Sequence, residues 1–147
     1  LMVTADGPKV LEFNCRFGDP ETQVVLPRMR SDLLDALEQT ALGDISGLAL
    51  DWDERPCVGV VMASGGYPNT YKTGKLISGL DAVPSGATVF HAGTDASNGV
   101  VQTSGGRVLS VSALGDNIAS ARTAAYEGVS AITFEGAFNR TDIAAAI

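Results

Sequence analysis

Short apolar runs separated by glycine-rich turns constrain the fold of this 147-residue chain most strongly. The chain has 17 glycines, and after residue 50 they concentrate in turns between apolar runs. Runs bounded by such turn signals are typical of short strands that pair with their neighbours in a sheet. Together with segments of helical spacing, the pattern predicts an α+β fold with a mainly antiparallel sheet.

The part after residue 50 carries most of the strand signals. Ser64–Pro68 predicts a tight loop because Gly-Gly and Pro are turn residues. Ser104-Gly105-Gly106 predicts a hairpin between the strands on either side of it. Strands are expected at 57–63, 88–90, 100–103, 108–114 and 132–134.

A helix is expected near the end of the chain, from about 117 to 131, with Asp116 as its N-cap. One face of this helix is apolar because four side chains recur at helical spacing. They are Ile118, Ala121, Ala125 and Val129.

The first fifty residues predict a hairpin followed by helices. Apolar runs at 1–5 and 9–15 flank Asp6-Gly7-Pro8, a strong hairpin signal, and Pro8 should lie in the turn because it cannot donate to a ladder. Pro20 suits the first turn of a helix over 21–30 that Pro27 should kink or split, with Asp19 as the N-cap.

A second helix is expected from Ser31, a candidate N-cap, to Gly43, which ends the run. A boundary near residue 50 would divide the chain into two parts, 1–50 and 51–147. The helix signal rests on the spacing of Leu33, Leu34, Leu37 and Ala41.

Charge and cysteine usage exclude several classes of function. The formal net charge is −7 and the basic residues are scattered, which argues against a nucleic-acid partner. Cys15 and Cys57 lie too far apart in sequence for a disulfide framework or a zinc site, and we expect inert core thiols in a cytoplasmic protein. No apolar stretch is long enough to predict a membrane span, and we expect no obligate protein partner.

Strand-like sequence begins at Leu1, and we therefore expect a chain cut from a longer protein.

Glu12, Asn14 and Arg16 form the first candidate site. Alternate strand residues share a face, so the three side chains point the same way if the strand over 9–15 holds that far. A carboxylate and an amide oxygen are hard ligands that suit Mg²⁺, and a guanidinium can hold a phosphate or a carboxylate. A solvated strand face has the same alternation, so spacing leaves both interpretations open. The opposite face, expected in a core, carries Leu11, Phe13 and Cys15.

The longer string around this triplet resembles one family closely. Pro8–Gln23, which reads PKVLEFNCRFGDPETQ, is similar to the end of the ATP-grasp domain of the glycinamide ribonucleotide synthetase (phosphoribosylamine–glycine ligase) family. The resemblance continues in order through Ser31-Asp32-Leu33, Trp52–Arg55, Ser64–Pro68, Phe90–Thr94, Gly105–Leu109, Ala125-Tyr126 and Arg140–Ile143.

The resemblance implies an ATP-dependent ligase of purine biosynthesis. In the family, glycine and the ATP γ-phosphate give an acyl phosphate, and the amine of 5-phosphoribosylamine attacks it to release phosphate. The resemblance makes Glu12 and Asn14 ligands of Mg²⁺ (or Mn²⁺) bound to the nucleotide. It implies the end of an ATP-grasp domain over 1–50 and a small C-terminal α+β domain over 51–147.

Departures from the family pattern limit what the resemblance implies. In the family, the nucleotide-covering loop and most substrate contacts lie upstream of the position that matches Leu1. We therefore expect the isolated chain to be inactive or merely to buttress an ATP-grasp core. Ala144 stands where the family usually has glycine. A related ATP-grasp enzyme, such as biotin carboxylase, is the other alternative, and Arg16–Glu21 argues against it.

Several other side chains allow two interpretations. Arg16 could orient glycine or its acyl phosphate, or instead pair with Asp19 or Glu21. The Gly65-Gly66 loop, flanked by Lys72 and Lys75, could cradle a phosphate, although a tight turn beside surface lysines explains it too. A general-base role for His91 is conceivable, but a lone histidine is more often structural.

Overall fold

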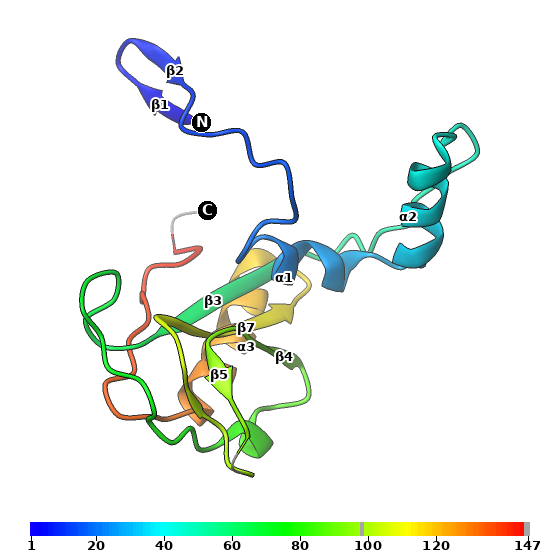
Figure 1. Ribbon diagram of the computed structural model, residues 1–147. Helices are drawn as coiled ribbons and strands as arrows, with labels where there is room; N and C mark the ends of the chain where they lie inside the picture. Colours follow the sequence, from blue (N-terminus) through cyan, green and yellow to red (C-terminus); the bar gives the residue numbers. More distant parts are fainter. Residues whose placement is uncertain (98, 146–147) are drawn as a thin grey trace.

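The computed structural model describes residues 1–97 and 99–145. Its centre is a three-stranded antiparallel sheet in the order β3-β7-β4, formed by Cys57–Ala63, Arg107–Leu114 and Ala87–His91 (Figure 1). A two-stranded ladder of β5 (Thr94–Asp95) and β6 (Gln102–Thr103) lies beside it. Every strand pairing in the described ranges is antiparallel, which confirms the expected α+β class.

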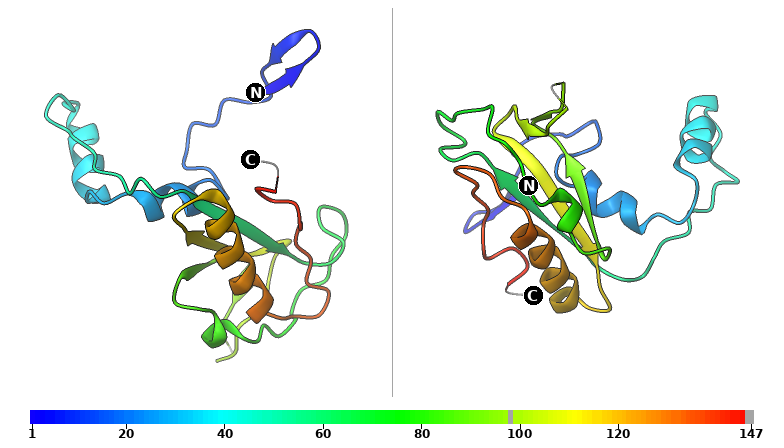
Figure 2. Two further views of the ribbon diagram at one scale, coloured as in Figure 1. Left: turned by 180° about the vertical axis from the view of Figure 1, so that it is seen from behind. Right: turned by 90° about the horizontal axis from the view of Figure 1, so that it is seen from below.

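Helix α3 (Ile118–Ala131) packs across one face of the sheet and closes the core (Figure 2). Val60 of β3 and Val111 of β7 are opposite each other in the register and fully buried. The helix contributes small side chains, and a Cβ at Gly128 would lie 2.7 Å from Val111 Cγ1, so helix and strand are in close contact. The buried residues of α3 are Ala121, Ala125, Gly128 and Val129.

Strand β7 is buried on both faces because α1 (Thr22–Val25) covers the second one. A Cβ at Gly59 of β3 would lie 2.7 Å from Val24 Cγ1, so glycine lets this short helix approach the sheet. Ser110 and Ser112 of β7 are buried on this face. A 3-10 helix η1 (Leu26–Arg28) follows α1 directly, which confirms that Pro27 interrupts the helix.

The first part of the chain extends away from this core in two arms (Figure 1). One arm is the hairpin of β1 (Met2–Thr4) and β2 (Gly7–Lys9), joined to α1 by an extended segment at 10–17. The other arm carries α2 (Leu33–Leu42), after which residues 43–56 return to β3. Another 3-10 helix, η2 (Leu80–Ala82), lies within the core part.

The hairpin forms, but its turn differs from the expected one. Pro8 lies in β2 opposite Val3, whereas Ala5 and Asp6 connect the strands, so the placement of Pro8 in the turn is wrong. A two-stranded hairpin has free outer edges where proline needs no ladder partner. The strand expected over 9–15 ends at Lys9, since no neighbouring strand is present within the described residues to bond the segment that follows.

The helix caps lie one or two positions from the expected residues. Glu21 occupies the N-cap position of α1, and Asp19 does not. Asp32 rather than Ser31 caps α2, accepting a hydrogen bond from Leu34 N at 2.7 Å. Asn117 rather than Asp116 caps α3 in a reciprocal capping box with Ser120. In α2 and α3 the residue next to the helix is the cap because its side chain reaches the free N–H groups, whereas the Glu21 side chain makes no such bond.

The strand pairing around β7 corrects two expectations. Strand β6 pairs with β5 and not with β7, so Ser104–Gly106 does not close a hairpin ladder. Strand β7 instead occupies the centre of the sheet, where its buried side chains are covered on both faces. Residues 132–134 form no strand, although Thr133 makes an isolated bridge with Ser78.

No helix in the described ranges is long and apolar enough to cross a bilayer.

Candidate functional site

Glu12, Phe13 and Asn14 lie on the extended segment between the hairpin and α1, and all three are exposed. The expectation that Phe13 and Cys15 point into a core is wrong here, since Phe13 is 84% exposed and Cys15 is also exposed. Leu11, expected on the same face, is 65% exposed. Alternation put these side chains on one face, but no other part of the described chain covers that face.

Local hydrogen bonds hold the segment after the triplet. Asn14 Oδ1 accepts from Arg16 N at 3.4 Å, and Arg16 Nη1 donates to the Phe17 carbonyl at 2.8 Å. No ion pair of Arg16 with Asp19 or Glu21 is present in the described chain, because Asp19 pairs with Arg107 instead. The Arg16 side chain therefore retains donors that can bind an anion.

The donor set of Glu12 and Asn14 fits Mg²⁺ or Mn²⁺ in kind, since both supply hard oxygens. It provides only part of an octahedral shell. Within residues 1–97 and 99–145, no group of three or more His, Cys, Asp or Glu side chains is placed to hold a metal. The two residues thus suit a metal whose other ligands are phosphate oxygens, waters or side chains from elsewhere.

The turn at Gly18–Pro20 joins this segment to the folded core. Thr22 N and Thr22 Oγ1 both donate to the Gly18 carbonyl, the former at 3.1 Å. Asp19 Oδ1 accepts from Gln23 Nε2 at 2.9 Å. The Glu21 carboxylate lies over Gly18, in the space that a Cβ at this position would need.

Arg107, the first residue of β7, reaches the same turn from the other end of the sequence. Its Nη1 donates to the Asp19 carbonyl at 2.7 Å, and its Nη2 lies 3.1 Å from Asp19 Oδ2. Sequence reasoning missed this contact, because 88 positions separate the two residues and neither has a local motif for the other.

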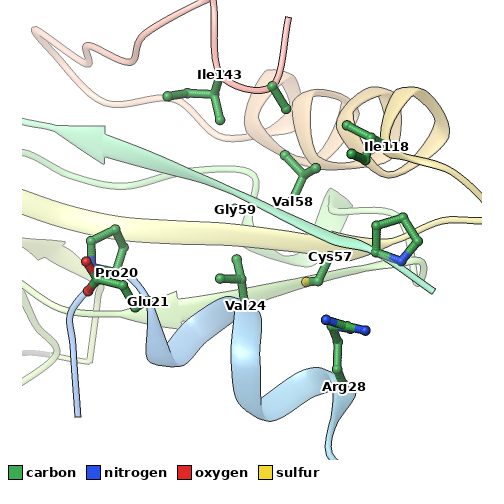
Figure 3. Close-up of a pocket in the computed structure, with 11 residues that line it drawn as sticks. Pro20, Glu21, Val24, Arg28, Cys57, Val58, Gly59, Ile118 and Ile143 are labelled. Carbon is green, nitrogen blue, oxygen red and sulfur yellow. The ribbon is translucent and has the colours of Figure 1, made fainter. Parts of the chain in front are cut away.

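A groove of about 400 Å³ runs along the outer edge of β3, beside α1 (Figure 3). Burial raises the pKa of the Cys57 thiol there, and the nearby Arg28 guanidinium lowers it by less. The walls of the groove are mostly aliphatic, with Glu21 and Arg28 as the charged groups. The groove is lined by Pro20, Glu21, Val24, Arg28, Pro56, Cys57, Val58, Gly59, Ile118, Ile143 and Ala144.

The Ser64–Pro68 loop is a tight turn, and Ser64 N donates to the Gly106 carbonyl at 2.8 Å. Tyr67 N donates to the Ser64 carbonyl at 3.1 Å, and Asn69 N to the Gly66 carbonyl at 2.9 Å. Lys75 Nζ, beside the loop, lies 2.7 Å from Glu135 Oε2. Lys75, and to a lesser degree Lys72, lowers the pKa of Glu135. The lysines thus face a carboxylate of the same chain.

His91 lies exposed at the end of β4, where its Nδ1 is 3.0 Å from Thr94 Oγ1. This contact links the strand to β5 and is consistent with a structural role.

A charged cluster that sequence reasoning did not select joins the two parts of the chain. The Asp53 carboxylate is buried, and Arg55 Nη2 and Nε contact it at 2.7 and 3.0 Å. Arg30 contributes a further contact of 3.3 Å. Hydrogen bonds from Arg55, and more weakly from Arg30, hold the pKa of Asp53 well below its usual range. The Asp-x-Arg spacing at 53–55 was the available signal.

Comparison with protein families matches two segments of the chain. The model described as "Phosphoribosylglycinamide synthetase, C domain" matches residues 57–146. The model described as "Phosphoribosylglycinamide synthetase, ATP-grasp (A) domain" matches residues 1–22. The second range contains the Glu12–Asn14 triplet and ends at Thr22, the first residue of α1, just after the turn that Arg107 contacts.

Similar proteins carry the same name in different bacteria. The chain is 55% identical over 145 residues to phosphoribosylamine–glycine ligase of Allochromatium vinosum, which covers 97% of this chain and 34% of that protein. It is 50% identical to the ligase of Caldanaerobacter subterraneus, with 99% and 34% covered. The chain thus spans about a third of the length of the curated relatives it matches.

A solved structure supports the same relationship. The crystal structure of phosphoribosylamine–glycine ligase from Thermotoga maritima matches with a TM-score of 0.78 and 33% identity, over 97% of this chain and 35% of that one. With the C-domain model matching more than half of its residues, the chain belongs to the phosphoribosylglycinamide synthetase family.

Proposed function

We propose that this chain supplies the end of the ATP-grasp domain and the C domain of a phosphoribosylamine–glycine ligase. The whole enzyme would join glycine to 5-phosphoribosylamine with ATP, giving glycinamide ribonucleotide, ADP and phosphate in purine biosynthesis. The observation that carries the proposal is that the two family models match one chain in order, at 1–22 and 57–146.

The same matches support a division of the chain near residue 50, into 1–50 and 51–147. The helical arm with α2 and its return at 43–56 lies between the two matched segments. An isolated bridge between Met29 and Trp52 closes the base of this arm.

In this proposal Glu12 and Asn14 contribute oxygen ligands to Mg²⁺ or Mn²⁺ bound with the nucleotide. Such an ion offsets charge on the β- and γ-phosphates during transfer. Their exposure, and the absence of a third acidic, histidine or cysteine ligand nearby in the described chain, support ligands that are completed by the nucleotide and by other residues.

Arg16 is assigned to the glycine carboxylate or its acyl phosphate. Its guanidinium is exposed and makes a bond only to the adjacent Phe17 carbonyl among the described contacts, so it keeps donors for a bidentate anion. The chemistry requires no protein nucleophile, because the glycine carboxylate attacks the γ-phosphate and the amine then displaces phosphate. Catalysis of this kind rests on positioning and charge neutralisation.

The proposal is tested in a full-length ligase. This 147-residue sequence replaces the matching third of the Allochromatium vinosum relative, and ADP release is measured with ATP, Mg²⁺, glycine and phosphoribosylamine. We expect ADP release that depends on both substrates. A folded chimera that releases no ADP would contradict the proposal.

Variants of the same chimera test the assigned residues. Glu12→Gln should lower kcat and raise the Mg²⁺ concentration needed for half-maximal rate, because one anionic ligand is lost. Arg16→Ala should raise the KM for glycine or lower kcat. Glu38→Gln, at an exposed carboxylate on α2, is the matched control and should change neither. An Arg16→Ala enzyme with unchanged glycine KM and kcat would remove Arg16 from the site.

A second function follows for the isolated chain, which would be catalytically silent and serve to buttress an ATP-grasp core. The exposed position of Glu12 and Asn14 on an unpaired segment favours it. Titration calorimetry with Mg²⁺ and ADP should show weak binding to the 147-residue chain. Micromolar affinity would overturn this expectation. A cytoplasmic location belongs to the same proposal and is consistent with the two free cysteines.

A further inference from the structure

The turn at Gly18–Pro20 is the point where the segment bearing the candidate ligands meets the folded core. Among the hydrogen bonds and ion pairs of the described residues, only those between Arg107 and Asp19 join residues 1–22 to residues 57–145. The turn's other hydrogen bonds among the described residues come from its own neighbours in sequence, Thr22 and Gln23. Arg107 is therefore the polar connection between the two matched segments.

The backbone of Arg107 is held by the sheet and by the packed loop that precedes it. It begins β7, the central strand of the sheet, directly after Gly105-Gly106. The Tyr67 ring occupies the space where a Cβ of Gly106 would lie, so the loop before Arg107 packs tightly against the Ser64–Pro68 turn. A guanidinium on such a base can fix both a carbonyl and a carboxylate through its planar fork.

Asp19 is held on two sides. Arg107 contacts its carbonyl and Oδ2, while Gln23 of α1 donates to Oδ1. Figure 3 shows α1, with Val24 toward Gly59, against strand β3. The turn is thus clamped between the start of β7 and a helix that packs on β3.

This clamp limits where the candidate ligands can lie. Arg16 is three positions before Asp19 and Asn14 is five, so their Cα atoms lie within roughly 10 and 18 Å of the anchor even when fully extended. Releasing Asp19 would let the segment pivot, and misplacement by about 1 Å can cost roughly a hundredfold in rate.

We infer that Arg107 is a positioning residue of the ligase. By anchoring Asp19, it aims the segment that carries Glu12, Asn14 and Arg16 toward the nucleotide and glycine. The inference rests on the proposed function for its catalytic part, and on the contacts above for the anchor itself.

The anchor is tested first in the 147-residue chain, without substrates. Amide hydrogen exchange is measured by NMR for Thr22, whose N–H donates to the Gly18 carbonyl, and for Val60 in the core. Arg107→Gln should speed exchange at Thr22 by at least about tenfold while Val60 stays protected. Unchanged exchange at Thr22 would overturn the anchor.

Arg122→Gln is the matched control. Arg122 donates to the Ile143 and Thr141 carbonyls at 2.9 and 2.7 Å, so the variant loses similar guanidinium–carbonyl bonds without contacting the turn. It should leave Thr22 exchange unchanged. Equal acceleration at Thr22 in both variants would show general loosening and contradict a specific clamp.

The catalytic part is tested in the full-length chimera. Arg107→Gln should lower kcat by roughly 10- to 100-fold and raise the Mg²⁺ requirement, and Arg107→Lys should restore part of the loss because it keeps charge without the fork. Asp19→Asn combined with Arg107→Gln should cost less than the two single effects together.

The outcomes separate the two proposals. An active wild-type chimera whose Arg107→Gln variant keeps the wild-type kcat and Mg²⁺ requirement would overturn the positioning role and leave the proposed function standing. A folded wild-type chimera without ADP release would overturn the proposed function and the catalytic part together, while Thr22 exchange still decides whether Arg107 anchors the turn.

Discussion

The two parts of this chain handle their apolar side chains in opposite ways. From 57 to 145, strands and helix α3 bury them, and Val60 and Val111 lose all contact with solvent. In the first fifty residues the same kinds of side chain stay exposed, including Leu11, Phe13 and Leu34 at 65%, 84% and 70%. Exposed apolar side chains that are clustered in this way are typical of surfaces that contact another protein or another domain. Stability therefore belongs to the second part, and the candidate ligands lie on the first.

Matched leucine variants test this contrast with the largest expected effect. Leu109→Ala, in β7 at 1% exposure, should lower the free energy of unfolding by about 2–5 kcal/mol through lost burial and a cavity. Leu11→Ala, on the exposed segment, should change it by less than about 0.5 kcal/mol. Urea unfolding followed by circular dichroism measures both. Equal losses would show that the first part shares the core's stability.

Two glycines with positive φ sharpen the comparison. Gly79 (φ +85°) leaves no room for a Cβ beside the Ala131 carbonyl, whereas Gly43 (φ +78°), which ends α2, has open space around it. Gly79→Ala should cost about 3 kcal/mol from strain and collision, and Gly43→Ala about 1 kcal/mol from strain alone. Thermal unfolding compares the two variants. A larger cost at Gly43 would contradict the conclusion that stability belongs to the second part of the chain.

The stability contributed by the charged cluster of Asp53, Arg55 and Arg30 should depend on pH. Because Arg55 holds the pKa of Asp53 below its usual range, the unfolded chain takes up this proton first as pH falls. Stability from this group is present above about pH 4 and is lost as pH drops toward the folded-state pKa. Asp53→Asn should flatten the fall in stability between pH 5 and 2, measured by urea titration at each pH.

Asp51→Asn serves as the control for that experiment. Asp51 is exposed and its side chain makes none of the described ion pairs. An equally flattened profile in this variant would contradict a special role for Asp53.

The smallest effect is expected for Ser112, on the face of β7 that α1 covers. Within the described residues, the buried Ser112 hydroxyl has no hydrogen-bond partner, whereas Thr103 Oγ1 accepts from Lys75 N at 3.0 Å. Ser112→Ala should raise stability by roughly 0.5–1 kcal/mol, and Thr103→Val should lower it by about 1–2 kcal/mol. Thermal unfolding of both variants gives the comparison. A loss in Ser112→Ala would indicate a partner, such as a buried water.

Local sequence patterns predicted much of the core. The strand at 57–63 and the apolar face of α3 formed as expected because periodicity and turn residues decide them locally. The pairing of β6 could not be predicted in this way, since β7 takes its partners from 57–63 and 87–91, far away in sequence. A central strand is selected by burial on both faces, which short-range turn signals do not report.

The candidate site was predictable in its residues but not in its surroundings. The string at Pro8–Gln23 marks Glu12, Asn14 and Arg16 through resemblance, and their roles stay predictions. Alternation wrongly implied that Phe13 is covered, because a strand face becomes a core only when something packs on it. The Arg107–Asp19 contact spans 88 positions and had no signal in either local sequence.

The contrast between the cysteines has a practical consequence for following this molecule in solution. Cys57 lies half-buried in β3 with a raised pKa, so its thiolate is scarce and poorly accessible to alkylating reagents. Cys15 is exposed and sits between Asn14 and Arg16. A single equivalent of maleimide dye will therefore label the segment that carries the candidate ligands, giving a fluorescent reporter of that segment without any introduced cysteine.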